Sequence, residues 1–436
     1  MDVGGVEQAD HGQISLSPGC ARMVLVYRTA LSDEDGTGGS GREGDFSMAS
    51  VRTLKQALDD SGGVGPGFHF MRHALSFGVI LVHCRTAAFW TASAAMIATG
   101  ERQAFHVGGP LSFSANDFLR PVMISLLAVF FALSGFLVTG SAVRTQRVPV
   151  FFANRALRII PALSVEVTLS ALFLGPIFTT WALSDYFSDR LFFRYFGNIF
   201  GFVTYHLPGV FENLPWTRNV NGSLWTLPSE FWCYALMMLV MWFTLLRHRR
   251  VLLWLVLGVA VCTAVGNILR PDIFVVRGPN FFMPWYIVFM FWSGATCFLY
   301  ADRIPLKASW FVVAAALYYL SVLFNLLVPL AVLPLTYCMA YAGMCAVPLW
   351  DRLVKSDYSY GIYLYAYPIM QAWISVLLPW STSQNAALYM AALFVLTLAT
   401  TTAFAALSWR FVEKPALSLR KVFLATLPGG NPRLGA

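Results

Sequence analysis

Long apolar blocks alternate with short polar connections along most of the chain. From residue 68 onward ten blocks follow one another, each about 20 residues long, and about 20 helical residues at 1.5 Å each cross a hydrocarbon layer of about 30 Å. The expected spans are 70–94, 119–141, 159–181, 224–246, 251–268, 281–300, 309–327, 330–349, 360–379 and 386–408. The pattern therefore predicts an all-α integral membrane protein with about ten transmembrane helices.

The composition agrees with this prediction. Of the 436 residues, 57% are hydrophobic and only 12% are charged, whereas a soluble protein carries about a quarter of charged residues. The net charge is +8, but the basic residues are scattered through short connections, which argues against a nucleic-acid partner. The seven cysteines show no CxxC and no Cys/His metal spacing, so we expect neither a disulfide framework nor a metal site.

Arginine and lysine are distributed unequally between the two sets of connections. One set is rich in them, while the alternate set holds few. The rich set includes Arg144, Arg147, Arg247, Arg303 and Arg410. The positive-inside rule places this set in the cytoplasm. Because the number of expected spans is even, both termini are expected in the cytoplasm as well. Membrane lipids are the expected surroundings of the spans.

The two ends of the chain differ from the apolar middle. Residues 1–66 are polar and glycine-rich, without an apolar run of spanning length or the order of a secretory signal. We expect this segment to be disordered, followed by a membrane domain over 67–415 and a cytoplasmic tail over 416–436. Because the stretch from Met48 reads as an ordinary cytosolic lead-in, translation could start at Met1 or at Met48.

The first expected span carries two ionisable residues that do not suit lipid. Arg72 and His83 are eleven residues apart, and eleven steps of about 100° come within about 20° of three full turns, about 16 Å along the axis. Such residues indicate a functional site by default. Their spacing suits a long anionic donor whose charged end stays at the membrane surface. The alternative is an anchoring arginine and a histidine that hydrogen-bonds another helix.

Further charges occur in the third and fourth spans. Arg155 and Arg158 lie three residues apart at the cytoplasmic mouth of the third span, where such a pair can hold phosphate groups; an arginine pair that only sets topology would look the same. Glu230 lies just after Pro228, which we expect to kink the start of the fourth span. A carboxylate there must pair with a cation or be protonated. For Glu166, in the third span, we favour a purely structural pairing.

A tyrosine-rich stretch, SYGIYLYAYP, opens the ninth expected span. It contains Tyr365 and Tyr367 directly before Pro368. By themselves, tyrosines near a membrane surface are typical of an interfacial belt.

Taken in order, these segments resemble the acyltransferase 3 family, which modifies bacterial surface polysaccharides, lipopolysaccharides and other extracytoplasmic acceptors. The resemblance runs from about residue 68 to residue 415. Its pieces are the spacing of Arg72 and His83, FFALSGFLVT over Phe130–Thr139, Arg155 and Arg158 with Pro161, SLWTLPSEFWCY over Ser223–Tyr234, Ser359–Pro368, and RFVEKP over Arg410–Pro415. Each piece by itself is weak evidence for the family, whereas six pieces in the same order as in the family are strong evidence.

The resemblance implies an enzyme of the bacterial inner membrane. Such an enzyme would move an acyl group, commonly acetyl, from cytoplasmic acyl-CoA to a hydroxyl of an extracytoplasmic or lipid-linked glycan, without a metal. By position, His83 would be the catalytic histidine, and Glu230 would contact the acceptor or tune that histidine. Arg72, Arg155 and Arg158 would bind the donor. A neutral His83 could act as general base; a covalent acyl-histidine is the open alternative.

The chain also departs from the family pattern. Many relatives carry a histidine where this chain has Ala366, so Tyr365 or Tyr367 would have to replace it if a second histidine matters. No hydrolase-like domain follows Pro415, which suggests a stand-alone transferase.

A competing hypothesis is a transporter of a lipid-linked sugar or small anion. Ten spans with charges inside the membrane fit it, but the repeated halves with matching broken helices that transporters often have are not evident. A structural scaffold would leave His83 and Glu230 unexplained. The acceptor, the length of the acyl group and the oligomeric state remain open at this stage.

Overall fold

The computed structural model describes residues 51–98, 115–270, 284–382 and 385–419, and within them every long element is a helix. Each of the ten expected spans coincides with a helical segment. The helices are α3 (Phe68–Ala98), α4 (Ala115–Thr145), α5 (Val148–Leu169), α9 (Leu227–Trp242), α10 (Arg249–Leu269), α12 (Pro284–Leu299), α13 (Ala308–Leu323), α14 (Val332–Gly343), α16 (Ser359–Leu377) and α17 (Ala386–Ser408). A π-helical turn joins α5 to α6 (Gly175–Phe178).

Seven helical segments of the described residues are long and apolar enough to cross a membrane. Three shorter apolar segments, Pro284–Leu299, Ala308–Leu323 and Val328–Gly343, account for the other expected spans. The prediction of a multi-span all-α membrane protein is confirmed.

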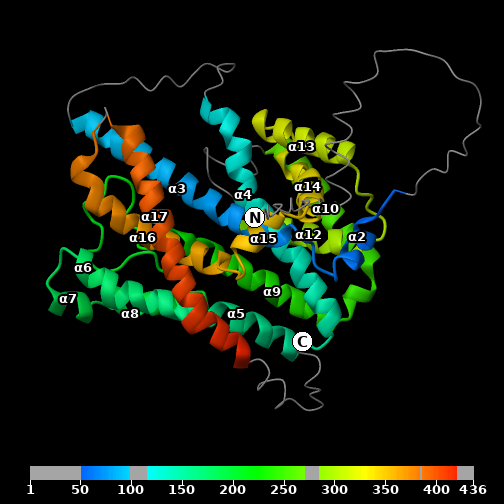
Figure 1. Ribbon diagram of the computed structural model, residues 1–436, viewed down its shortest axis with the longest axis horizontal. Helices are drawn as coiled ribbons and strands as arrows, with labels where there is room; N and C mark the ends of the chain where they lie inside the picture. The colour runs from blue at the N-terminus through cyan, green and yellow to red at the C-terminus, as the bar shows by residue number, and fades with distance from the viewer. Residues whose placement is uncertain (1–50, 99–114, 271–283, 383–384, 420–436) are drawn as a thin grey trace, which may run out of the picture.

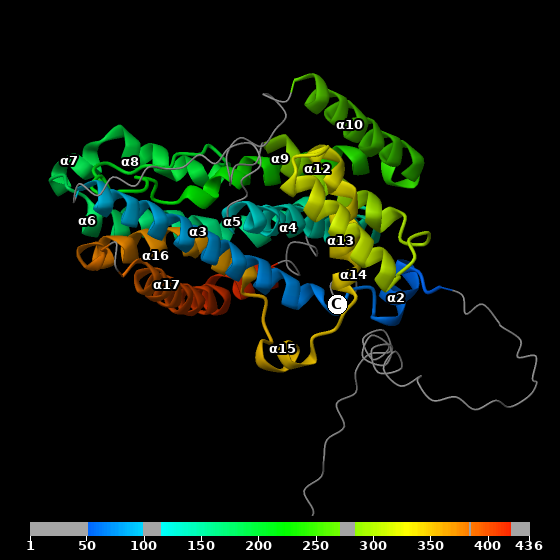
Figure 2. The ribbon, with the colours of Figure 1, turned by 90° about the horizontal axis from the view of Figure 1, so that it is seen from above.

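Helix α3 lies in the middle of the bundle. Helices α16 and α17 pack against it on one side, and α4 packs against it on the other. Helices α12, α13 and α14 gather around α4, and α5 and α9 pack together beside them (Figures 1 and 2). The first span of the chain therefore contacts both the second span and the last two.

Two glycines allow α4 and α12 to touch backbone to backbone. A Cβ atom at Gly135 would lie 1.8 Å from the carbonyl oxygen of Phe291, and one at Gly294 would lie 1.9 Å from that of Ala132. Small residues at helix crossings are the usual means of close packing in membranes, where burial of apolar surface adds little. This crossing fixes α4, which lines every cavity described below.

Helix α9 begins where the sequence suggested a kink. A 3₁₀ turn over Gly222–Thr226 precedes it, and Pro228 occupies its first turn. A proline there loses no helical hydrogen bond, because the first N–H groups of a helix have no intrahelical acceptor. The irregular start expected for this span therefore takes the form of a 3₁₀ turn followed by α9, with Pro228 and Glu230 in the first turn of that helix.

The polar N-terminal segment is ordered where the structure describes it. Helix α2 (Leu54–Asp60) begins with a capping box in which Thr53 and Gln56 bond each other's backbone N–H groups. The buried Leu54 also donates its N–H to the carbonyl of Ile304 over 2.8 Å. The expected disorder therefore does not hold for α2, whereas residues 1–50 lie outside the described residues. Of the expected tail, 416–419 continue the last helix and 420–436 lie outside that description.

Candidate active site

A cavity of about 760 Å³ opens among α3, α4, α5, α9 and the start of α16. Five arginines line it. They are Arg72, Arg144, Arg147, Arg155 and Arg158. Two carboxylates, Glu230 and Asp357, line it as well. We call this cavity the arginine chamber. Its excess of guanidinium groups suits a ligand with several negative charges, above all phosphates, which arginine can bind through paired hydrogen bonds.

Asp357 connects two of the predicted donor-binding residues. Its Oδ2 atom accepts a bond from Nη2 of Arg158 at 2.9 Å and forms an ion pair with Nη1 of Arg72. The hydroxyl of Ser359 donates to its other oxygen at 2.5 Å. Burial by itself would raise the pKa of Asp357, but the two guanidinium groups and Ser359 hold that pKa well below its usual range. Asp357 thus ties α3, α5 and α16 together at the rim of the chamber.

Arg158 is enclosed on further sides. Its guanidinium lies 5.8 Å from the ring centroid of Tyr360 and 5.9 Å from that of Trp409. Its Nη1 lies 3.8 Å from Oε2 of Glu413, a buried carboxylate at the end of the last span. Two carboxylates and two aromatic faces therefore hold this guanidinium in place.

Tyr365 belongs to the same polar network and lies away from His83. Its hydroxyl donates to Oγ of Ser408 at 3.2 Å, and that oxygen donates to Oε1 of Glu413 at 3.3 Å. Since Glu413 contacts Arg158, Tyr365 is linked to the arginine chamber through α17. It is not placed to replace a second histidine beside His83.

Arg155 and Glu230 meet through Tyr234. The Tyr234 hydroxyl donates to Oε1 of Glu230 at 2.5 Å and also interacts with Arg155. Arg155 further reaches the hydroxyl of Ser141 at 3.5 Å. The expected pairing of Glu230 with a cation is therefore indirect and runs through a tyrosine that the sequence interpretation did not single out.

His83 lies on α3, beyond the inner end of the arginine chamber, and lines a second cavity of about 90 Å³. Its ring meets the ring of Tyr367 edge to face, with 5.3 Å between centroids. Tyr367 in turn packs at 5.7 Å against Trp216 of the connection before α9. The hydroxyl of Tyr367 interacts with Thr217 and Asn219 of that connection. The ring of Tyr367 therefore packs against the imidazole of His83, while its hydroxyl interacts with the connection before α9 and not with His83.

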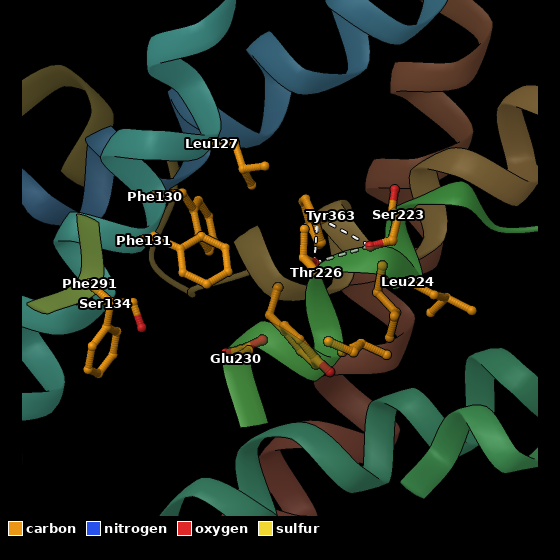
Figure 3. A pocket seen from close by; sticks show the side chains of 13 residues that line it. Leu127, Phe130, Phe131, Ser134, Ser223, Leu224, Thr226, Glu230, Phe291 and Tyr363 are labelled. Carbon is orange, nitrogen blue, oxygen red and sulfur yellow. Dashed lines mark hydrogen bonds between the residues drawn. The ribbon is translucent and has the colours of Figure 1, made fainter. Parts of the chain in front are cut away.

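A third cavity of about 40 Å³ lies between the other two. It shares Phe130, Ser134, Glu230 and Tyr360 with the arginine chamber. It shares Leu127, Ser223 and Tyr363 with the cavity of His83. In Figure 3, Leu127, Phe130 and Phe131 face the hydrogen-bonded group of Ser223, Thr226 and Tyr363 across this space. The three cavities therefore follow one another from the arginines to the imidazole.

Of the predicted site residues, the structure brings Arg72, Arg155, Arg158 and Glu230 to one chamber and His83 to the far end of the same series of cavities. Glu166 is buried as expected for a structural residue: Ser170 and Asn221 each donate to its Oε1 at 2.9 Å. The sequence interpretation missed Asp357 and Glu413. The only local signal for Asp357 was its position two residues before the SYGIYLYAYP stretch.

Comparison with known proteins agrees with the resemblance to an acyltransferase family. Residues 66–406 match the family model described as an acyltransferase domain. "Nodulation protein 10" of Rhizobium leguminosarum bv. viciae is 27% identical over 342 residues, covering 73% of this chain and 89% of that protein. The "O-acetyl transferase" of Shigella phage Sf6 is 28% identical over 310 residues, covering 66% of this chain and 84% of that protein. No solved structure matches.

Proposed function

We propose a specific reaction for this chain, which belongs to the acyltransferase 3 family and is a membrane O-acyltransferase. In this proposal it moves an acetyl group from acetyl-CoA to a hydroxyl of an extracytoplasmic or lipid-linked glycan. The observation that carries the proposal is the series of cavities from the arginine chamber to His83. The name of the phage relative supports acetyl as the group transferred.

The arginine chamber would receive the phosphates of the donor. Arg72 and Arg158 already share Asp357, so they would shape the rim and act on the ligand together with that carboxylate. Arg155 contacts the neutral hydroxyls of Ser141 and Tyr234. Of the three predicted donor-binding arginines, Arg155 is therefore the one whose positive charge is best placed to bind a phosphate.

His83 would supply the proton chemistry at the other end. The pantetheine arm of the donor would pass the narrow cavity and bring the thioester to the imidazole, a distance of about 16 Å along α3 from Arg72. The neutral imidazole takes the proton of the acceptor hydroxyl as its oxygen attacks the thioester carbonyl. The new ester C–O bond forms, the C–S bond breaks, and the leaving thiolate takes up the proton that His83 received.

The positions of the basic residues also support an orientation of the protein in the membrane. The arginine chamber lies on the side whose connections are rich in arginine and lysine, which the positive-inside rule assigns to the cytoplasm. Acyl-CoA would enter from there, and both termini would lie on the same side of a bacterial inner membrane. The acceptor would approach His83 from the opposite side.

Mass spectrometry of surface glycans tests the proposal. A strain with the wild-type protein should carry O-acetyl groups that a strain with His83→Ala lacks, while the variant remains in the membrane. The matched control is His206→Ala, because His206 is exposed and does not line the three cavities. Unchanged O-acetylation with His83→Ala would overturn the proposal. Binding of acetyl-CoA to the solubilised protein tests the identity of the donor separately.

A further inference from the structure

The cavity of His83 has a character different from that of the arginine chamber. Helix α4 supplies much of its wall through Met123, Ile124, Leu126 and Leu127. Helix α3 adds two valines beside His83, and Trp225 closes another side. Among the described residues that line it, none is a lysine, arginine, aspartate or glutamate. The reacting end of the donor would therefore enter a small and mostly apolar space.

The size of this space limits the acyl group. An apolar cavity of about 150 Å³ in another protein takes up one benzene molecule, whereas the cavity of His83 measures about 90 Å³. It has room for a carbonyl with a single methyl group or one or two further carbons. A six-carbon acyl chain exceeds this volume, so it would have to displace side chains of the wall, which is unfavourable, or extend out through the open side of the cavity.

Leu127 lies where two of the cavities meet. It lines both the cavity of His83 and the narrow cavity of about 40 Å³. Whichever of these two spaces receives the acyl chain, the Leu127 side chain bounds it. Met123 lies four residues earlier on α4, hence on the same face of the helix, and lines the cavity of His83.

We propose that Leu127 and Met123 set the length of acyl group that this enzyme transfers, and restrict its donors to short uncharged acyl thioesters. The inference rests on the proposed function, since it assumes that an acyl-CoA thioester reaches His83. A succinyl group would bring a carboxylate into the apolar wall, which costs free energy without a paired cation. Arg85 contacts the sulfur of Met123 at 3.8 Å but does not line the cavity.

The test uses inverted membrane vesicles from a strain that makes the full chain and its own acceptor. Acetyl-, butyryl-, hexanoyl- and succinyl-CoA are supplied in turn, and release of free CoA is measured relative to vesicles with His83→Ala. Four proteins are compared: wild type, Leu127→Ala, Met123→Ala and Leu119→Ala. Leu119 is the matched control, because it lies on the same helix α4 with 46% of its surface exposed and lines none of the three cavities.

We expect the wild type to prefer acetyl over hexanoyl by at least about tenfold, since even one methylene group in an apolar pocket can change selectivity by about 10- to 200-fold. Leu127→Ala or Met123→Ala should reduce that preference about tenfold or more, and Leu119→Ala should leave it unchanged. If Leu127→Ala fails to fold, Met123→Ala decides. Equal use of hexanoyl- and acetyl-CoA by the wild type would overturn this inference alone. A preference for succinyl-CoA would overturn both this inference and the assignment of acetyl as the transferred group. Absence of transfer from every donor would instead overturn the proposed function.

Discussion

Nη2 of Arg158 lies 2.9 Å from Oδ2 of Asp357, although 199 residues separate them in the chain. The same carboxylate oxygen also pairs with Arg72. One aspartate thus holds two arginines of the predicted donor site at a fixed spacing.

Replacing Asp357 by Asn should weaken both the fold and the binding of the donor. The variant leaves two guanidinium groups close together without a shared anion, and loss of one partner of a partly buried charge pair costs about 1–3 kcal/mol. Thermal unfolding in detergent and the KM for acetyl-CoA measure the two effects. The control is Asp302→Asn, whose 2.7 Å pair with Arg249 is more exposed and should contribute less than about 1 kcal/mol. Equal effects of the two variants would contradict the role given to Asp357.

The contribution of Asp357 should also depend on pH in one direction. Its pKa is lowered in the folded protein by Arg72 and Arg158, so its stabilising effect is fully present above the pKa of the unfolded state, about 3.9. The effect is lost progressively as the pH falls below about 4 toward the folded-state pKa. The difference in melting temperature between wild type and Asp357→Asn should therefore shrink in acid. A difference that stays constant from pH 7 to pH 3 would argue against the ion pair as its cause.

Arg155→Ala should reduce affinity for acetyl-CoA and make the remaining binding less sensitive to salt. A hydrogen bond between charged groups is worth about 1.5–3 kcal/mol, so the dissociation constant should rise about 10- to 150-fold. Isothermal titration of the solubilised protein at two salt concentrations measures both effects. Arg249→Ala serves as control, because Arg249 pairs with Asp302 and does not line the chamber. Unchanged affinity in Arg155→Ala would remove this residue from the donor site.

Gly294→Ala should destabilise the crossing of α4 and α12. The added Cβ would lie 1.9 Å from the Ala132 carbonyl oxygen, so the helices must move apart at a cost of about 1–3 kcal/mol. Gly258→Ala on α10 is the matched control, since a Cβ there meets no atom within 4 Å. In a helix this change is favourable by about 0.5–1 kcal/mol. Thermal unfolding compares the two, and a Gly294→Ala variant as stable as the wild type would show that the contact is not tight.

The membrane class and the approximate positions of the helices could be predicted from the amino-acid sequence, because the length and apolarity of a span are local properties of the chain. It also placed Arg72 and His83 on one helix face, since the period of a single helix decides which of its own residues share a face. The family resemblance pointed to an acyltransferase, which the comparison with family members confirmed.

Which side chains from different helices meet could not be predicted from the sequence, because it depends on how the helices pack. Asp357 lies in a connecting stretch and Glu413 lies in the RFVEKP piece of the resemblance. Nothing in the sequence marked either carboxylate as a partner of Arg158, yet both reach it. Tyr365 and Tyr367 are two residues apart, but one turns to α17 and the other to His83. Helical periodicity separates such neighbours by about 200°. Their partners, however, depend on how the helices pack, and that packing rests on long-range contacts such as the glycine crossing of α4 and α12.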